Sequence, residues 1–165
     1  MFNWNLPSAE DYDLMHEILG GYGEPQPGKI IAPTGKPYLY RWTIQSTPFF
    51  NLYMHVQVAS DEEGMHTHPW MSQSVILSGG YYEVVGARVG SSYVPLHPVR
   101  RKPMEVIQRG TDIPHRLLLP DEVEYSLSLF FTGPRVKDWG FWVNGKWINS
   151  KDMVRMEGAT SKRIR

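Results

Sequence analysis

The chain has 165 residues, 41% of them hydrophobic, and its seventeen basic side chains balance seventeen acidic ones. This balance argues against a nucleic-acid-binding protein that neutralises phosphates and against a polybasic protein of membrane surfaces. The absence of cysteine excludes disulfides, thiolate zinc sites and cysteine nucleophiles. The sequence has no secretory signal and no apolar run of membrane-spanning length, so a cytoplasmic protein is expected.

Residues 1–37 are predicted to form an N-terminal helix and an irregular arm. Ser8 is a suitable N-cap, Met15 belongs to an apolar helical stripe, and Gly20-Gly21 ends the pattern. The remainder of this segment is rich in glycine and proline, which predicts a connection without regular structure.

From residue 38 onward the apolar period changes to two. In FNLYMHVQVAS (50–60), apolar side chains alternate with Tyr53, His55 and Gln57, so one face of the predicted strand is apolar and the other polar but uncharged. Many further short runs follow, each bounded by glycine, proline or acidic residues. The pattern predicts an all-β sandwich or barrel over 38–150, followed by a C-terminal tail over 151–165, in one domain overall.

Two turns carry hairpin signals. SQSVILSG and YYEVVGARVG are predicted to pair about Gly79-Gly80, and Asn144-Gly145 separates two short apolar runs near the end of the barrel region. The second signal is the stronger, because Asn-Gly suits the positive φ angles of a two-residue hairpin turn.

The sequence contains six histidines, of which His16 and His97 are predicted to lie at the surface. His66 and His68 lie one residue apart, and on an extended backbone they point to the same side, where they could share one metal ion at about 2.1 Å. A third ligand must come from a facing strand, and His115 is the best candidate. Spacing alone leaves two readings open, metal ligands or solvated turn residues.

A family resemblance favours the metal. HTHPWMSQSVILSGG (66–80) resembles the first motif of the cupin superfamily, the RmlC-like jelly-roll proteins: His-x-His, four residues, a ligand position at Gln73, six residues, and a turn glycine. GTDIPHRLLL (110–119) is similar to the second motif, which ends on His115. It lacks the second glycine of that motif and has Leu119 at the position of its asparagine.

More specifically, the chain is similar to an uncharacterised group of small single-domain cupins that carry HDHPW. The matching segments here are HTHPW (66–70), LSGGYYE (77–83) and TGPRVKDWGF (132–141). The resemblance implies a double-stranded β-helix, the cupin jelly-roll barrel, with the N-terminal helix added to it. It implies a divalent metal on His66, His68 and His115.

Gln73 departs from the pattern, because many metal cupins have glutamate there. A neutral amide at this position resembles the three-histidine iron sites of thiol dioxygenases and argues against oxalate-oxidase chemistry. Fe(II) is therefore the expected metal, with zinc, manganese or nickel as alternatives, and Gln73 is a further candidate ligand. Glu83 is either a ligand or a general base that supplies the missing charge, or a carboxylate at the sheet rim paired with arginine.

Several other residues are candidates for contact with substrate. His55 and Tyr53 contact it if their face lines the barrel lumen, whereas His55 otherwise bonds a neighbouring strand. Trp70 is close enough to the histidine pair to wall the pocket. An arginine directed inward would bind an anionic group, although surface exposure is the alternative. The candidates are Arg41, Arg109 and Arg116.

The sequence thus predicts a metal-binding cupin, with a non-haem Fe(II)-dependent oxygenase acting on a small polar molecule as the first hypothesis. A metal-dependent isomerase, lyase or hydrolase and a non-enzymatic small-molecule-binding cupin are the alternatives. The expected partner is a small molecule, with no nucleic acid and no membrane. Edge strands and abundant aromatic residues are compatible with a homodimer.

Overall fold

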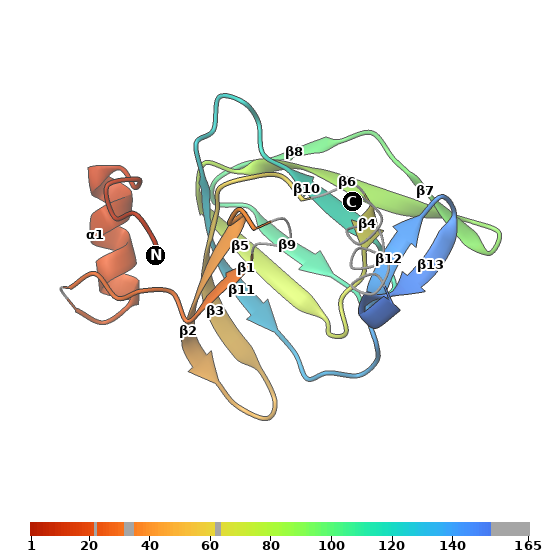
Figure 1. Ribbon diagram of the computed structural model, residues 1–165, viewed down its shortest axis with the longest axis horizontal. Helices are drawn as coiled ribbons and strands as arrows, with labels where there is room; N and C mark the ends of the chain where they lie inside the picture. Colours follow the sequence, from red (N-terminus) through yellow and green to blue (C-terminus); the bar gives the residue numbers. More distant parts are fainter. Residues whose placement is uncertain (22, 32–34, 62–63, 153–165) are drawn as a thin grey trace, which may run out of the picture.

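The structure is a computed structural model and describes residues 1–21, 23–31, 35–61 and 64–152. Two antiparallel sheets form a nearly closed barrel, and one helix lies outside it (Figure 1). The predicted tail lies outside the described residues from position 153 onward, as do four positions of the predicted arm, 22 and 32–34. Within the described ranges no helix has the length and apolar character needed to cross a membrane.

The first sheet has six strands in the order β1-β2-β3-β11-β5-β9. These strands are β1 (Lys29–Ile31), β2 (Leu39–Ser46), β3 (Asn51–Gln57), β5 (Ser72–Ser78), β9 (Val106–Arg109) and β11 (Ser126–Thr132). The second sheet has the order β13-β12-β4-β10-β6-β7, and β8 also pairs with β6. Its strands are β4 (Met65–His66), β6 (Tyr81–Val89), β7 (Ser92–Pro95), β8 (Val99–Arg101), β10 (His115–Leu118), β12 (Gly140–Val143) and β13 (Lys146–Asn149).

The strand order identifies the architecture. Between β3 and β11 the chain alternates between the sheets except at β6, β7 and β8, which all belong to the second sheet. Of the eight strands of the barrel, β3, β5, β9 and β11 lie in one sheet and β4, β6, β8 and β10 in the other. The resulting orders, β3-β11-β5-β9 and β4-β10-β6-β8, are those of an eight-stranded jelly roll, or double-stranded β-helix. The predicted all-β fold is confirmed.

This topology corrects one predicted hairpin and confirms the other. β5 and β6 follow each other through Gly79-Gly80 but belong to different sheets, so they do not pair. A glycine turn between two period-two runs is a hairpin signal, but it does not show whether the strands stay together or diverge into separate sheets. Asn144-Gly145 forms the expected hairpin turn, with φ angles of 50° and 76°, and Val143 pairs with Lys146 across it.

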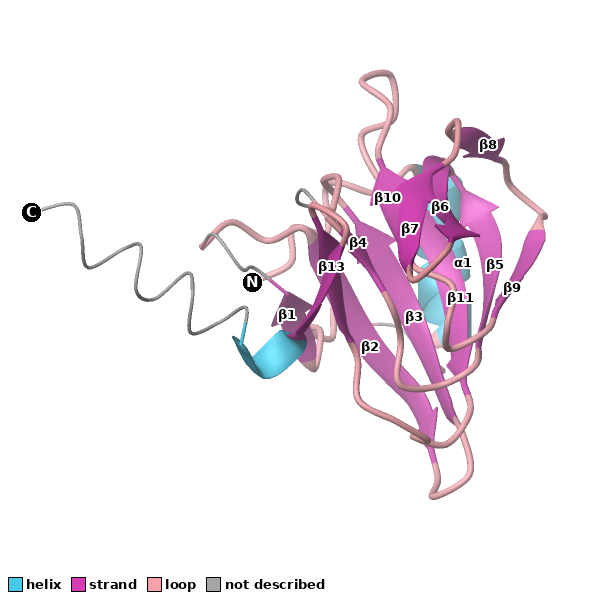
Figure 2. Cartoon of the chain, turned by 90° about the vertical axis from the view of Figure 1, so that its right-hand side faces the viewer, coloured by secondary structure: helices cyan, strands magenta, loops and turns pink. Residues whose placement is uncertain are grey.

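The helix α1 (Ala9–Ile18) begins where the sequence predicts. The Ser8 hydroxyl accepts a hydrogen bond from the Asp11 backbone N–H at 3.2 Å. Met15 packs against Met54 and Val56 of β3, and all three side chains are fully buried. The helix therefore covers the outer face of the six-stranded sheet, and Figure 2 shows it behind the strands. Because the apolar face of β3 meets the helix, its polar face is left for the barrel interior.

The two histidines predicted to lie at the surface are outside the barrel interior. His16 is buried rather than exposed as predicted, and its Nδ1 lies 2.8 Å from the carbonyl oxygen of Tyr12. His97 is exposed, as predicted.

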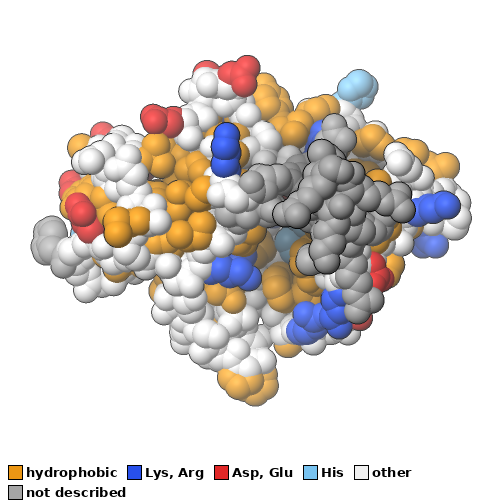
Figure 3. All heavy atoms as spheres, in the orientation of Figure 1, with side chains coloured by type: hydrophobic (Ala, Val, Ile, Leu, Met, Phe, Trp, Pro, Cys, Tyr) orange, Lys and Arg blue, Asp and Glu red, His pale blue; other side chains and the backbone are white. Residues whose placement is uncertain are grey.

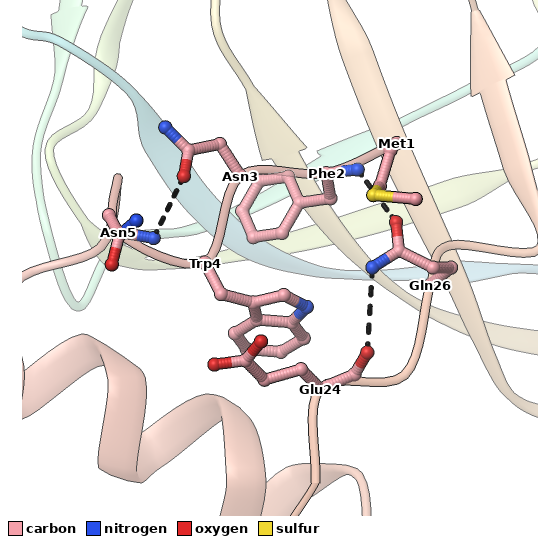
Figure 4. A pocket seen from close by; sticks show the side chains of 7 residues that line it. All are labelled: Met1, Phe2, Asn3, Trp4, Asn5, Glu24 and Gln26. Carbon is pink, nitrogen blue, oxygen red and sulfur yellow. Dashed lines mark hydrogen bonds between the residues drawn. The ribbon is translucent and has the colours of Figure 1, made fainter.

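A cavity of about 340 Å³ lies along the N-terminal segment (Figure 4), and the residues that line it are Met1, Phe2, Asn3, Trp4, Asn5, Glu24 and Gln26. It includes none of the predicted site residues.

Candidate metal centre

Three histidines meet inside the barrel. His66 lies on β4 and pairs in register with His115 at the start of β10, and His68 follows two residues after His66. One ligand atom from each side chain lies within 4.8 Å of the others. The Nε2 atoms of His68 and His115 are 2.9 Å apart. The cluster predicted from the two sequence motifs is therefore assembled by the fold.

The geometry and charge of this cluster fit a divalent metal. Two nitrogens bound at about 2.1 Å and at a right angle lie about 3.0 Å from each other, close to the separation of the two Nε2 atoms. Burial lowers the pKa of His66 and His68, and it lowers the pKa of His115 to about 3. The imidazoles are thus neutral at pH 7, which is the form that binds a metal.

Carboxylates stand behind two of the three imidazoles. The Nδ1–H of His115 donates to Glu83 Oε1 at 2.9 Å, which leaves its Nε2 lone pair facing His68. Asp61 Oδ2 lies 3.9 Å from the Nδ1 of His66 and also accepts the backbone N–H of Leu117 at 2.7 Å. Carboxylates in such positions fix the ring and the tautomer of histidines that bind metals.

Glu83 is also the centre of a buried ionic network. Arg101 Nε donates to its Oε2 at 2.8 Å and Arg109 Nε donates to its Oε1 at 2.6 Å. Arg109 uses its other two nitrogens on Ser74 Oγ at 2.9 Å and Tyr81 Oη at 3.0 Å. The side chain of Glu83 is 1% exposed. The network therefore links β5, β6, β8, β9 and β10 by hydrogen bonds next to His115.

This position differs from the prediction that Glu83 is a ligand or a general base. Burial alone would raise its pKa, but the hydrogen bond from His115 and the charge of Arg109 outweigh burial and hold the pKa far below its ordinary value. Such a carboxylate is a weak proton acceptor. The arginine pairing that the sequence left as the alternative is found, although inside the barrel rather than at the rim.

No protein-family model and no curated protein sequence matches this chain. Among solved structures it is similar to the DMSP lyase DddQ from Ruegeria pomeroyi DSS-3, with 13% identity over 77% of this chain and 62% of that chain and a TM-score of 0.51. It is also similar to an RmlC-like cupin family protein with a double-stranded β-helix fold from Methanocaldococcus jannaschii, with 10% identity over 71% and 95% of the two chains and a TM-score of 0.47.

At this level of identity the likeness concerns the fold alone, and the chain spans 62% of the length of DddQ. The strand order described above is that of a jelly roll, and His66 of β4 pairs with His115 of β10 inside it. The chain has the double-stranded β-helix, or jelly-roll, fold. Its three histidines, drawn from both motifs, form a cluster that can hold a metal.

Two predicted site residues point away from the histidines. Gln73 of β5 pairs with Phe131 of β11, so the two side chains lie on the same face of the sheet. This is the outer face, because Phe131 is 42% exposed. Ser74, which binds Arg109, occupies the inner face instead. Arg116 follows the buried His115 along β10, so it projects from the opposite face of the strand. The proposals of Gln73 as a ligand and Arg116 as a substrate contact are therefore corrected.

The predicted polar face of β3 does line the interior. The ring of His55 stacks on Phe130 with a centroid distance of 4.9 Å, and Phe130 lies 6.1 Å from His68. Tyr53 stacks beside His55 at 6.0 Å. The ring of Trp70 lies 6.2 Å from that of His68 and nearly parallel to it. His55 also accepts a hydrogen bond from Arg41 of the neighbouring strand β2, which is the alternative that the sequence left open. Contact of Tyr53, His55 and Trp70 with a substrate stays a prediction.

Sequence reasoning missed several residues around the site. Asp61 and Arg101 are not among the predicted residues, yet they lie within ion-pair distance of His66 and Glu83. Phe130 was one of several apolar residues in a strand. Its alternation with Ser128 could have placed it on the inner face, since Ser126, Ser128, Phe130 and Thr132 share one period of two.

Proposed function

We propose that this cupin is a non-haem Fe(II)-dependent oxygenase that acts on a small polar molecule, with His66, His68 and His115 as the metal ligands. The observation that carries the proposal is a cluster of three neutral imidazoles that includes no carboxylate in the described part of the chain. When bound, Fe(II) supplies redox chemistry with O₂, and three protein ligands leave room for substrate on the ion.

The protein side chains have separate tasks in this proposal. Glu83 holds His115 through its Nδ1–H and keeps Nε2 directed at the metal position, while Asp61 stands behind His66. The rings of Trp70, Phe130 and Phe141 surround the imidazoles and restrict water. These residues orient ligands and exclude solvent, and none of them is required to move a proton.

The absence of a proton-transferring task separates the oxygenase from the isomerase, lyase or hydrolase alternative. In the sequence prediction, Glu83 was the residue that moved the proton in those reactions. Its carboxylate instead accepts N–H bonds from Arg101, Arg109 and His115. An oxygenase needs no protein base at this place, so the pairing of Glu83 favours it over a reaction that would use Glu83 as the base.

The proposal is tested on protein purified without chelators. Metal analysis is expected to give about one divalent ion per chain. Anaerobic loading with Fe(II) followed by titration with nitric oxide is expected to give a ferrous-nitrosyl signal in electron paramagnetic resonance. The oxygenase proposal fails if the loaded protein gives no such signal, and the non-enzymatic alternative is supported if wild-type protein retains no metal.

A further inference from the structure

Arg41 is a cationic side chain on the inner face of the barrel that has no acidic partner among the described residues. It lies on β2 opposite His55 of β3, and its exposure is intermediate. Its Nε donates to His55 Nε2 at 2.8 Å, and its guanidinium carbon lies 4.5 Å from the centroid of Tyr53. Arg101 and Arg109, by contrast, each form an ion pair with Glu83.

Within the described part of the chain, His55 alone takes a hydrogen bond from the Arg41 side chain, which leaves its other donors available to a ligand. A guanidinium has five N–H groups, of which the bond to His55 uses one. No described residue accepts a hydrogen bond from Nη1 or Nη2 of Arg41, so four N–H groups are left. Burial lowers the pKa of Arg41, which is the effect expected of a desolvated cation without a carboxylate. The side chain is nonetheless held in place by His55 and Tyr53.

Arg41 shares the inner surface with the metal cluster. His55, which Arg41 contacts, stacks on Phe130, and Phe130 in turn lies beside His68. A ligand lying across the ring of Phe130 would therefore have the guanidinium at one end and the three imidazoles at the other. Phe130 would contact the apolar part of such a ligand between its two polar ends.

The charge of the interior favours an anion. Arg101 pairs with Glu83 and Glu105, Arg109 pairs with Glu83, and Asp61 stands behind His66, whereas Arg41 has no carboxylate partner among the described residues. A divalent ion on neutral histidines would add to this positive charge. Acidic and basic side chains are both exposed on the face of the molecule that Figure 3 shows.

We infer that Arg41 is the anion-binding residue of the substrate site, and that the substrate is a small organic acid whose carboxylate binds Nη1 and Nη2 while its other polar end reaches the metal. A carboxylate fits these two nitrogens because its two oxygens match the guanidinium fork. This inference rests on the proposed metal site and adds the chemical class of substrate. It also separates the roles of the arginines, since Arg101 and Arg109 already bind Glu83.

The test is calorimetric titration of zinc-loaded protein with hydroxy acids of two to four carbons and with the corresponding amides, which lack the charge. For 3-hydroxypropanoate against 3-hydroxypropanamide, wild-type protein is expected to prefer the acid at least tenfold. Arg41→Gln is expected to abolish the preference, and Arg41→Lys to retain a part of it, because lysine keeps the charge but not the fork. Arg88→Gln, a change of an exposed arginine on β6, is the matched control and should keep the preference.

The outcomes distinguish this inference from the proposed function. If the protein binds metal but no acid in the series binds more tightly than its amide, the role of Arg41 is wrong and the metal site stands. The same conclusion follows if Arg41→Gln keeps the preference. If wild-type protein binds no metal, the metal analysis shows this before any titration, and both conclusions fall.

Discussion

At the scale of single residues, His115 joins the two halves of the site. Its Nε2 faces His68, while its Nδ1–H donates to Glu83, which also holds Arg101 and Arg109. The imidazole thus connects the metal position to a buried ionic network. We therefore expect loss of the imidazole to affect metal binding, and loss of the Glu83 charge to affect both metal binding and stability.

Replacing His115 by alanine should remove the metal. With one of three ligands missing, the metal content of purified protein is expected to fall from about one ion per chain to less than a tenth of that value. Elemental analysis measures the content, and circular dichroism checks that the fold is retained. His97→Ala, at an exposed position, is the control and should keep the full content. Retention of the ion by folded His115→Ala protein would contradict the assignment of the ligand.

Replacing Glu83 by glutamine should destabilise the protein and weaken the metal site. Arg109 would be left as a buried cation without its carboxylate, at an expected cost of about 3 kcal/mol in the free energy of unfolding. The metal affinity is expected to fall about 10- to 100-fold, because His115 loses the acceptor that orients it. Urea unfolding and competition with a chelator measure the two effects.

Glu105→Gln is the matched control for that change. Glu105 is partly exposed and its Oε2 lies 3.9 Å from Arg101 Nη1, so the change is expected to cost less than about 1 kcal/mol. Equal effects of the two substitutions would show that the buried network has no special role.

Some residues of the site could be predicted from the sequence and others could not. His66, His68 and His115 could be predicted because their spacing and motif context are properties of the sequence itself. Gln73 was misplaced because motif spacing counts residues and does not show the face of the strand. The register with Phe131 and the inner position of Ser74 decide that face, and both depend on strands far apart in the sequence.

At the scale of elements, local signals predicted what is local. The cap at Ser8 and the Asn144-Gly145 turn are both as expected, since each depends on a few neighbouring residues. β1 was missed, because its three residues lie in a segment rich in glycine and proline and are fixed by pairing with β2. The sequence also did not predict that β5 and β6 lie in different sheets, because this depends on pairing with strands elsewhere in the chain.

The helix α1 should contribute to stability without contributing to the site. Met15 is fully buried between the helix and the outer face of the six-stranded sheet, so Met15→Ala is expected to lower the free energy of unfolding by about 3 kcal/mol. Metal content should be unchanged, since the histidines lie on the other side of that sheet. Urea unfolding measures the loss, with Glu17→Ala on the exposed helix face as the control. Loss of metal from folded Met15→Ala protein would show that the helix is coupled to the site.

At the scale of the whole molecule, the fold class was predictable and the sheet order was not. Alternation with a period of two and frequent turns indicate many short strands, and the histidine motifs indicate a cupin. The order of strands depends on long-range pairs such as β3 with β11 and β4 with β10. These pairs place His55, His66, His68 and His115 in one interior, so the protonation of these histidines affects the stability of the whole protein in acid.

The stability of the metal-free protein should fall as the pH is lowered below about 6.5, the ordinary pKa of histidine. Burial lowers the pKa of His55, His66, His68 and His115, to about 3 for His115, so the unfolded chain binds more protons than the folded one between these values. Each histidine that is protonated only in the unfolded chain contributes a slope of about 1.4 kcal/mol per pH unit. Glu83 acts at lower pH, because its depressed pKa adds stability that is present above its ordinary value of 4.5 and lost in stronger acid.

Urea unfolding at intervals from pH 8 to pH 5 measures this dependence. A free energy that is flat above pH 7 and then falls with the uptake of more than one proton is expected. His55→Gln should reduce the number of protons by up to one, because it removes one buried neutral imidazole that is not a metal ligand. Saturating zinc should move the fall to lower pH, since protons must then compete with the ion for three of the four rings. A stability that is constant or rises between pH 6.5 and pH 5 would mean that these imidazoles are not buried in the neutral form, and the charge state on which the metal centre depends would be wrong.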